Sequence, residues 1–303
     1  MQMIKKRKRK NGKKKTELEE MIAFMRGKPK YKKLVKHLKE LGAMIGMDDL
    51  KKAVIGQIQF ILTNDHKLDE HYLNTVLQGP PGCGKTTVAE ILYNIWSSLE
   101  LFDENTEFTI LHRSDLVGTY MGHTANKTRK LLTKLAGGVI FIDEAYSLIS
   151  GEKDEYGKEA LDQINAFLSE EKGQTVMILA GYEHDLNERI FESNAGLKRR
   201  FGWQFTIAPY TAEQLFQIFK IQLKKHNWTC DLSTQQLFVE HFDSFKHAGG
   251  DTENIAFKAK LEYCRDNWQA KRQTRKLSVK HVERAMQATF VQKEDSGYLN
   301  MYM

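Results

Sequence analysis

The feature that most constrains this chain is the stretch LQGPPGCGKTTVAEIL, residues 77–92. Three glycines and two prolines stand directly before a lysine and two threonines, between a short apolar segment and one with helical spacing of apolar residues. Because glycine lacks a Cβ, the backbone can adopt left-handed angles and direct successive N–H groups at one anion. The stretch therefore predicts a phosphate-binding P-loop rather than an ordinary turn between a strand and a helix.

The residue types in this loop suggest a role for each position. We expect Lys85 to reach the β- and γ-phosphates of a nucleotide and the Thr86 hydroxyl to ligate Mg²⁺. The helix expected over 85–99 would present the positive end of its dipole to the phosphates. The residues predicted to surround the nucleotide here are Gly79, Pro80, Pro81, Gly82, Cys83, Gly84, Lys85, Thr86 and Thr87.

A second motif, GGVIFIDEA, begins about 60 residues after the P-loop and ends an apolar run with two acids. Open α/β sheets place their ligands at the carboxyl ends of the strands, where these acids would lie. Hydrolysis of a bound triphosphate needs a metal ligand and a residue that orients water. We expect Asp143 to hold Mg²⁺, directly or through water, and Glu144 to polarise the attacking water.

Strands and helices alternate from residue 74 onward, which predicts a parallel sheet with right-handed crossovers. The runs GVIFI and VMILA are unbroken apolar segments, as expected of central strands buried on both faces. The predicted strands are TVLQ, EFTILH, GVIFI, TVMILAG and WQFTIA, with helices over 85–99, 124–136, 158–170 and near 184–192. The expected fold class is thus α/β, with a five-stranded parallel sheet.

The pattern changes at Pro209, beyond which only helical patterns follow, near 211–226, 233–246, 252–271 and 278–291. Capping boxes are predicted at Thr16/Glu19, Thr211/Gln214 and Ser233/Gln236. Three helices are expected before the first strand. The predicted organisation is a basic tail over 1–15, N-terminal helices over 16–44, an α/β nucleotide-binding domain over 45–208, a small all-α lid over 209–292 and a C-terminal tail over 293–303.

The net charge of +7 belongs to the N-terminal tail. Nine of the 46 basic residues lie within residues 5–15, which contain no acid, and the other 37 face 39 acidic residues. The tail is predicted to be a nuclear-import signal, an anchor for nucleic acid or another polyanion, or a solubilising tail without a partner. Three cysteines without a CxxC pair, no membrane-spanning apolar run and no signal sequence favour a soluble intracellular protein.

The blocks IGMDDLKK, GPPGCGKTT, RSDLVGTYMGHTANKT, GGVIFIDEAYSL, AGYEHDL and NAGLKRRF resemble AAA+ ATPases. The closest resemblance is to the group of red-type Rubisco activase (CbbX, also called CfxQ) and stage V sporulation protein K, from about Ile45 to Phe205. This resemblance implies ATP hydrolysis with Mg²⁺, a ring that is usually a hexamer, and remodelling of a partner protein whose identity it does not give.

The resemblance also implies site residues. Ile45 and Gly46 match positions beside the adenine. Arg200 matches the arginine finger that enters a neighbouring subunit's site, and Arg199 is a second candidate. Tyr120, followed by Met121, matches the aromatic pore-loop residue that grips an extended polypeptide.

This chain departs from related proteins in two places. Where many AAA+ proteins have a polar sensor asparagine, it has AGY with Tyr182, as its group does. Where the related activases carry a lid arginine that touches the γ-phosphate, it reads GGDTENIA. Either Lys258 or Lys260 substitutes for this arginine, or the lid does not sense the γ-phosphate directly.

Two other classes of function remain open from the sequence. One is a nucleic-acid motor or loader anchored by the basic tail, although the body is slightly acidic and shows no helix-turn-helix or zinc module. The other is a scaffold that binds ATP without turnover, against which Lys85, Asp143, Glu144 and Arg200 argue.

Overall fold

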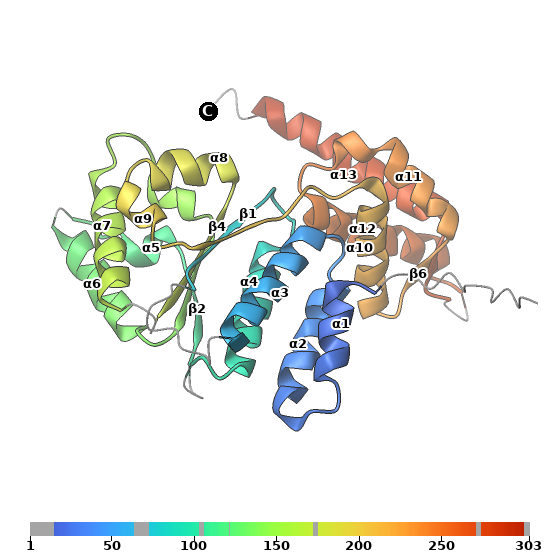
Figure 1. Cartoon of the computed structure of the whole chain (residues 1–303). Helices are drawn as coiled ribbons and strands as arrows, with labels where there is room; N and C mark the ends of the chain where they lie inside the picture. The colour runs from blue at the N-terminus through green and yellow to red at the C-terminus, as the bar shows by residue number, and fades with distance from the viewer. Residues whose placement is uncertain are drawn as a thin grey trace, which may run out of the picture.

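A computed structural model of the chain describes residues 15–63, 73–102, 106–120, 122–171, 175–270 and 274–299, with side chains up to residue 290. The greater part of the predicted basic tail and Met121 lie outside the described residues. The described chain forms an α/β body followed by a helical lid (Figure 1).

The body is built on a five-stranded, wholly parallel sheet in the order β2-β3-β4-β1-β5. Every residue of β1, β3 and β4 is buried, whereas the edge strands β2 and β5 are partly exposed. The predicted five-stranded α/β fold is thereby confirmed. The strands are β1 (Thr75–Gln78), β2 (Phe108–Leu111), β3 (Val139–Ile142), β4 (Val176–Gly181) and β5 (Trp203–Thr206).

Alternate residues of the central strands pack against helices on opposite faces of the sheet. Leu77, Phe141 and Ile178 belong to one hydrophobic core, whereas Val76 and Ile140 belong to a second one. The first core includes α3 (Asp48–Thr63) and α4 (Lys85–Ser98), and the second includes α6 (His123–Lys134) and α7 (Glu155–Glu170). Shorter elements join them, namely α5 (Arg113–Leu116), η2 (Ala145–Leu148), α8 (Glu183–Asp185), the π-helix η3 (Leu186–Phe191) and α9 (Ala195–Lys198).

Two further helices precede the sheet and extend the first core. These are α1 (Glu17–Met25) and α2 (Lys32–Ala43), joined by the 3-10 turn η1 (Pro29–Tyr31). The predicted capping box of Thr16 and Glu19 begins α1. Leu34, Leu38 and Leu41 recur at helical spacing on α2 and are fully buried, so one face of α2 is fixed on the body and the opposite face is exposed.

The lid has its own hydrophobic core. Its helices are α10 (Ala212–Lys225), α11 (Gln235–Glu240), α12 (Ala248–Asn267) and α13 (Val279–Leu299), with 3-10 turns η4 (Leu232–Thr234) and η5 (Phe242–Ser244). Thr211 and Gln214 form the predicted capping box. The predicted box of Ser233 and Gln236 is wrong, because Ser233 lies inside η4 and α11 begins without a side-chain cap.

The lid also contains a short parallel pair of strands, β6 (Thr229–Cys230) and β7 (Lys276–Leu277), that the sequence patterns did not predict. Two-residue strands are too short to show a period of two. Helix α13 continues to Leu299, so the predicted C-terminal tail from residue 293 begins inside this helix. Within the described residues, no helix has the length and apolar character needed to cross a membrane.

Candidate functional site

The predicted P-loop joins β1 to α4 and has the backbone geometry that its glycines permit. Gly82 and Gly84 have φ angles of 68° and 91°, in the left-handed region that side chains with a Cβ disfavour. A Cβ on Gly79 would lie 2.9 Å from the Cys83 sulfur and 3.0 Å from the Ile207 carbonyl oxygen. Glycine is therefore required at these positions for the loop to close as it does.

The polar side chains of the loop already converge with those of the second motif. Lys85 Nζ donates hydrogen bonds of 2.9 Å to the carbonyl oxygens of Gly79 and Pro80. Thr86 Oγ1 donates to Asp143 Oδ2 at 3.2 Å, across 57 positions of sequence. The structure thus brings together the lysine, the threonine and the acid that the sequence predicted as one site.

Glu144 follows Asp143 at the end of β3 and has an unusual backbone. Its φ of 47° and ψ of 46° lie in the left-handed region, which a glutamate adopts only when its surroundings impose the angles. Its N–H donates to Asp143 Oδ1 at 3.0 Å. The two neighbouring acids are therefore held in a fixed relation, with the Asp143 carboxylate bonded to both Thr86 and the Glu144 amide.

These groups line a cavity of about 510 Å³ between the body and the lid. The cavity is large enough for a small-molecule ligand, and ligand cavities typically measure about 300–1,000 Å³. Its lining includes Ile45, the loop from Pro81 to Thr87, Asp143 and Glu144. Gly46, Gly79 and Pro80 were also predicted to surround the nucleotide, but they are not among the residues that line the cavity. Gly46 instead shapes the turn between α2 and α3, with a φ of 66°.

Two aromatic residues that the sequence did not single out as a pair also line the cavity. Tyr146 and Tyr182 stack with ring centroids 5.2 Å apart. Burial, the Glu144 carboxylate, and hydrogen bonds to Tyr182 and Glu144 raise the pKa of Tyr146 well above its usual value. Lys85 Nζ lies 5.3 Å from the Tyr182 ring centroid. The stack therefore connects the lysine of the P-loop to the acid of the second motif.

The lid closes the cavity through direct contacts with the P-loop. The Tyr210 hydroxyl donates to the Cys83 carbonyl oxygen at 2.8 Å, and the Gly249 N–H donates to the Gly82 carbonyl oxygen at 3.1 Å. Gln222 in turn donates to the Gly249 carbonyl oxygen. A change in the conformation of the loop would therefore act on the lid through these hydrogen bonds.

The lid cation in the cavity is Lys225, in the last turn of α10. Among the described residues, Lys85 and Lys225 are the two cations that line this cavity. Lys258, a candidate from the sequence, donates to the Ala288 carbonyl oxygen instead. Lys260 lines a smaller neighbouring pocket of about 230 Å³ that Lys225 also borders, and its pKa is lowered by burial. No sequence pattern pointed to Lys225.

Arg200 lies at the end of the sheet where the strands begin, whereas this cavity lies at the end where they finish. Its carbonyl oxygen accepts a hydrogen bond from Asn74, the residue before β1, whereas the P-loop follows the other end of β1. The four residues of β1 separate these two ends by about 13 Å. The Arg200 guanidinium donates to Ser169 Oγ and to the Gly196 carbonyl oxygen, while Arg199 is exposed. Neither arginine lines the cavity of its own chain.

Tyr120 is separate from the nucleotide cavity as well. Its side chain is 68% exposed in the loop between α5 and α6, and its ring packs edge-on against His123 at 5.6 Å. Lys127 and Lys130 border the same shallow pocket, and none of the described residues that line it is acidic. The residue is therefore a surface aromatic, and its loss would leave the buried core intact.

The polar groups that line the cavity fit a nucleoside triphosphate with Mg²⁺. Backbone N–H groups at a helix N-terminus and a lysine suit phosphate oxygens. Within the described residues no group of three or more His, Cys, Asp or Glu side chains forms a metal cage. Mg²⁺ at nucleotide sites is bound by one or two carboxylates together with phosphate oxygens and water, which the pair of Thr86 and Asp143 matches.

Sequence comparisons identify proteins similar to this chain. Residues 75–202 match the family described as "ATPase family associated with various cellular activities (AAA)". The chain is 34% identical to cfxQ-like protein R730 of Acanthamoeba polyphaga mimivirus over 75% of its own length and 57% of that protein. It is 32% identical to stage V sporulation protein K of Bacillus subtilis, over 70% of its own length and 67% of that protein.

Other similarities cover less of the relative's sequence or concern solved structures of lower sequence identity. The chain is 33% identical to the ESX-1 secretion system protein EccA1 of Mycolicibacterium smegmatis over 63% of its length, but spans only 34% of that protein. Among solved structures, the AAA domain of FIGL-1 in complex with ADP matches with a TM-score of 0.59 and 21% identity, covering 82% of this chain and 83% of that one. A RuvB variant of Thermotoga maritima matches with a TM-score of 0.60 and 18% identity, covering 82% and 72%. These two likenesses concern the fold alone.

Proposed function

The chain belongs to the AAA family of ATPases, in the group of stage V sporulation protein K and the cfxQ-like proteins, and we propose that it remodels a partner protein as an oligomeric ring. In this proposal, ATP hydrolysis in the cavity moves the exposed Tyr120 loop against an extended segment of the partner. The observation that carries the proposal is the 68% exposed Tyr120, an aromatic on a loop whose described residues do not line the nucleotide cavity. Large apolar rings suit sequence-tolerant gripping.

The chemistry assigned to the cavity follows from its side chains. Thr86 and Asp143 would hold Mg²⁺, which supplies positive charge to the phosphate oxygens. Lys85 would exchange its bonds to the Gly79 and Pro80 carbonyl oxygens for phosphate oxygens, a stronger charge-assisted contact. Glu144, whose carboxylate raises the pKa of the nearby Tyr146, would orient and polarise the attacking water.

The need for a ring follows from the position of the arginines. Phosphoryl transfer is accelerated by a further positive charge at the transition state, which an arginine finger supplies. Arg200 lies at the end of the strands away from the cavity of its own chain. We propose that it completes the cavity of a neighbouring copy. Arg199, exposed beside it, is the second candidate. A hexamer is the ring size we propose from the family.

The lid is proposed to report the nucleotide state through Lys225. This lysine lines the cavity together with Lys85, and Glu253 of α12 lines it as well. Binding of a γ-phosphate would draw Lys225 inward, and the Gly249 contact with Gly82 would transmit the shift along α12.

The proposed function is tested by trapping the partner. The Glu144→Gln variant, immobilised with ATP, should retain a protein that is released on exchange to ADP. The double variant Glu144→Gln/Tyr120→Ala is the matched control, and should bind ATP equally but retain no protein. Retention of nucleic acid in place of protein, or ATPase stimulation by DNA with a steep salt dependence, would contradict the proposal.

A further inference from the structure

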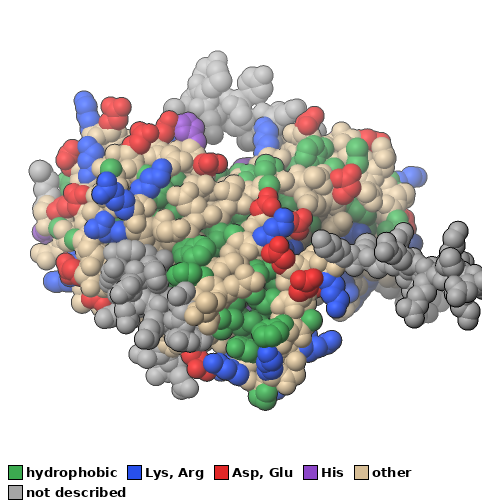
Figure 2. All heavy atoms as spheres, viewed as in Figure 1, with side chains coloured by type: hydrophobic (Ala, Val, Ile, Leu, Met, Phe, Trp, Pro, Cys, Tyr) green, Lys and Arg blue, Asp and Glu red, His purple; other side chains and the backbone are tan. Residues whose placement is uncertain are grey.

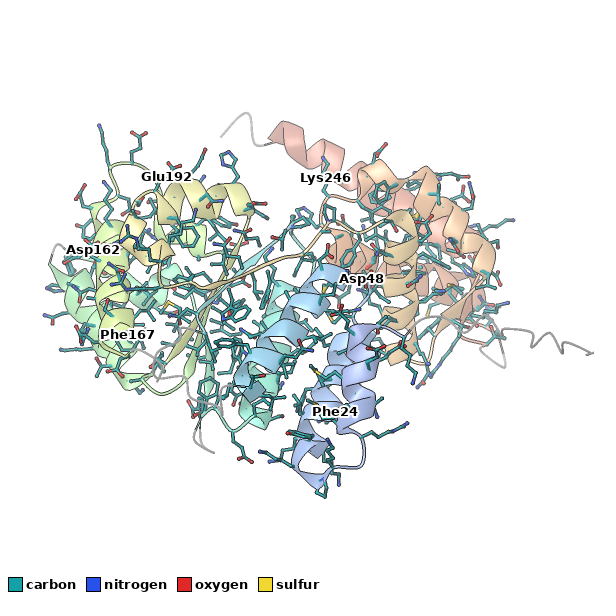
Figure 3. All side chains as sticks on the ribbon, in the orientation of Figure 1. Phe24, Asp48, Asp162, Phe167, Glu192 and Lys246 are labelled. Carbon is teal, nitrogen blue, oxygen red and sulfur yellow. The ribbon has the colours of Figure 1, made fainter. Side chains whose placement is uncertain are left out.

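The exposed side of the α1–α2 pair carries a groove that the ATPase function does not use. The groove has a volume of about 730 Å³. Its apolar lining comes from Met25, Pro29, Val35 and Ala43. In Figure 2, Lys and Arg side chains border hydrophobic ones around the lower end of this pair, where Figure 3 labels Phe24. A groove with an apolar floor in this position is a candidate docking surface.

The rim of the groove is strongly basic. Five cations line it, and Glu40 is the single acid among its described lining residues. Glu40 is itself occupied, because its carboxylate lies 2.7 Å from His37 Nδ1 and 3.9 Å from Lys36 Nζ. The cations are Arg26, Lys28, Lys32, Lys36 and Lys39. The rim therefore presents uncompensated positive charge above an apolar floor.

Phe24 extends the apolar surface at the tip of the pair. Its side chain is 68% exposed, and Lys28 Nζ lies 3.5 Å from its ring centroid. An exposed aromatic ring next to a cation can receive both an apolar and a negatively charged side chain of a ligand. The combination of apolar surface and positive charge in the groove therefore extends to the tip of the pair.

This combination selects among occupants by charge complementarity. An amphipathic helix can lay apolar residues on the floor and direct acidic residues at the rim. Helix α2 has 12 residues, so the groove can accommodate about three turns of such a helix, roughly 18 Å. Nucleic acid would supply negative charge but no apolar side chains. Residues 5–15 of the chain itself carry charge of the same sign as the rim.

The groove and the nucleotide cavity meet at the end of α2. Ala43 lines both, and the next two residues, Met44 and Ile45, line the nucleotide cavity. Lys51 Nζ donates to the Met44 carbonyl oxygen at 2.7 Å and so fixes this turn to α3. Gly46 follows with a φ of 66°, and a Cβ there would lie 2.8 Å from Nε2 of Gln214 in the lid. The turn thus contacts groove, nucleotide cavity and lid.

We propose that this groove binds an acidic amphipathic segment of a partner protein, and that its occupancy changes the affinity of the neighbouring cavity for nucleotide. The coupling is reciprocal, because two ligands that affect each other's affinity do so by the same factor. The proposal does not rest on ring assembly or on the action of Tyr120. It describes an adaptor site at which a partner protein regulates the ATPase.

The experiment uses the full chain and a fluorescein-labelled peptide of three helical turns, with leucines on one face and glutamates on the other. Anisotropy gives its dissociation constant. Lys32→Glu/Lys39→Glu should weaken binding about tenfold or more, since each reversal replaces attraction by repulsion. Lys30→Glu/Lys33→Glu is the matched control, with the same change of charge on exposed residues of η1 and α2 that do not line the groove. It should change binding by at most about threefold.

The remaining readouts decide between occupants. Saturating peptide should shift the dissociation constant of ATP in the wild type but not in Lys32→Glu/Lys39→Glu, which should keep the wild-type melting temperature and basal ATPase activity. The proposal is overturned if the peptide fails to bind at ~1 mM, if a lysine–leucine peptide binds as well, or if ATP affinity does not respond. Tighter binding of duplex DNA that the rim variant abolishes would overturn it in favour of nucleic acid. Loss of self-association in the rim variant would overturn it in favour of a second copy.

Discussion

The rings of Tyr146 and Tyr182 stack 5.2 Å apart, with their planes 18° from parallel, beside Glu144 in the nucleotide cavity. Arg189 lies 5.9 Å from the centroid of the Tyr146 ring. Glu144 has a left-handed backbone, and its carboxylate is one of the groups that raise the pKa of Tyr146, two residues further along the chain. We therefore expect Tyr146 to position the Glu144 carboxylate, which is proposed to polarise the attacking water.

Tyr146→Phe should lower kcat while leaving ATP affinity nearly unchanged. Phenylalanine keeps the stacked ring but removes the hydroxyl that we expect to hold the Glu144 carboxylate. A hydrogen bond to a charged group contributes about 1.5–3 kcal/mol, so kcat should fall roughly ten- to a hundredfold. Steady-state kinetics and a nucleotide-binding titration measure the two effects, and a thermal melt checks the fold. A rise in KM at constant kcat would contradict this role.

The sequence predicted the parts of the site that local patterns encode. Gly82, Lys85 and Thr86 form one contiguous motif, and Asp143 with Glu144 ends a recognisable apolar run. The Tyr146–Tyr182 stack depends instead on η2 packing beside the end of β4, so no local spacing reveals it. The five strands of the sheet, by contrast, were predictable, because each is a local apolar run.

Lys225 shows the same limit for the lid. The sequence directed attention to α12, where related proteins carry an arginine, and so to Lys258 and Lys260. Lys225 belongs to α10, and it reaches the cavity only because α10 and α12 pack together in the lid core. Similarly, β6 and β7 pair through two residues each, although α11 and α12 lie between them in the sequence. Such contacts follow from tertiary packing and are absent from the local sequence.

Lys225→Ala should weaken ATP binding more than ADP binding, because the proposed partner of Lys225 is the γ-phosphate. Removing a charge-assisted hydrogen bond at a partly exposed site should lower ATP affinity about three- to thirtyfold. Lys258→Ala is the matched control, since Lys258 bonds to Ala288 of α13 and does not line the cavity, and this variant should leave both affinities unchanged. Titration with fluorescent nucleotide analogues gives the comparison. Equal weakening of ATP and ADP would place Lys225 elsewhere on the nucleotide.

Glu144→Gln and Lys85→Ala should separate turnover from binding. The amide of glutamine keeps the size of the side chain but polarises water poorly, so the loss falls on the transition state. Removing Lys85 deletes a contact expected already in the ground state. Glu144→Gln should thus bind ATP with normal affinity and hydrolyse it at least ~10²-fold more slowly, whereas Lys85→Ala should bind poorly. Equal ATP affinity in the two variants would show that their roles are misassigned.

Arg200→Ala should abolish most hydrolysis, and mixing should restore part of it. Fingers supplied in trans contribute ~10³–10⁵ in rate. Subunits with Arg200→Ala retain an intact P-loop, and subunits with Lys85→Ala retain an intact finger, so mixed rings contain some complete sites. Arg199→Ala is the comparison variant and should lose at most a few-fold activity. Specific activity that does not rise from nanomolar to micromolar protein would argue against a site shared between copies.

Tyr120→Ala should uncouple ATP hydrolysis from work on the partner protein. Tyr120 is 68% exposed and its ring packs against His123 at the surface, so its removal creates no core cavity and should lower the melting temperature little. Tyr120 does not line the nucleotide cavity, so basal ATPase activity should stay within a few-fold of wild type. Stimulation by the captured partner, and remodelling of that partner, should collapse because the gripping surface is gone.

Tyr120→Phe is the matched control and should retain both stimulation and remodelling, since the ring remains. ATPase assays with and without partner, run beside a thermal melt, separate the outcomes. A variant that remodels its partner at the wild-type rate would remove the role proposed for this loop.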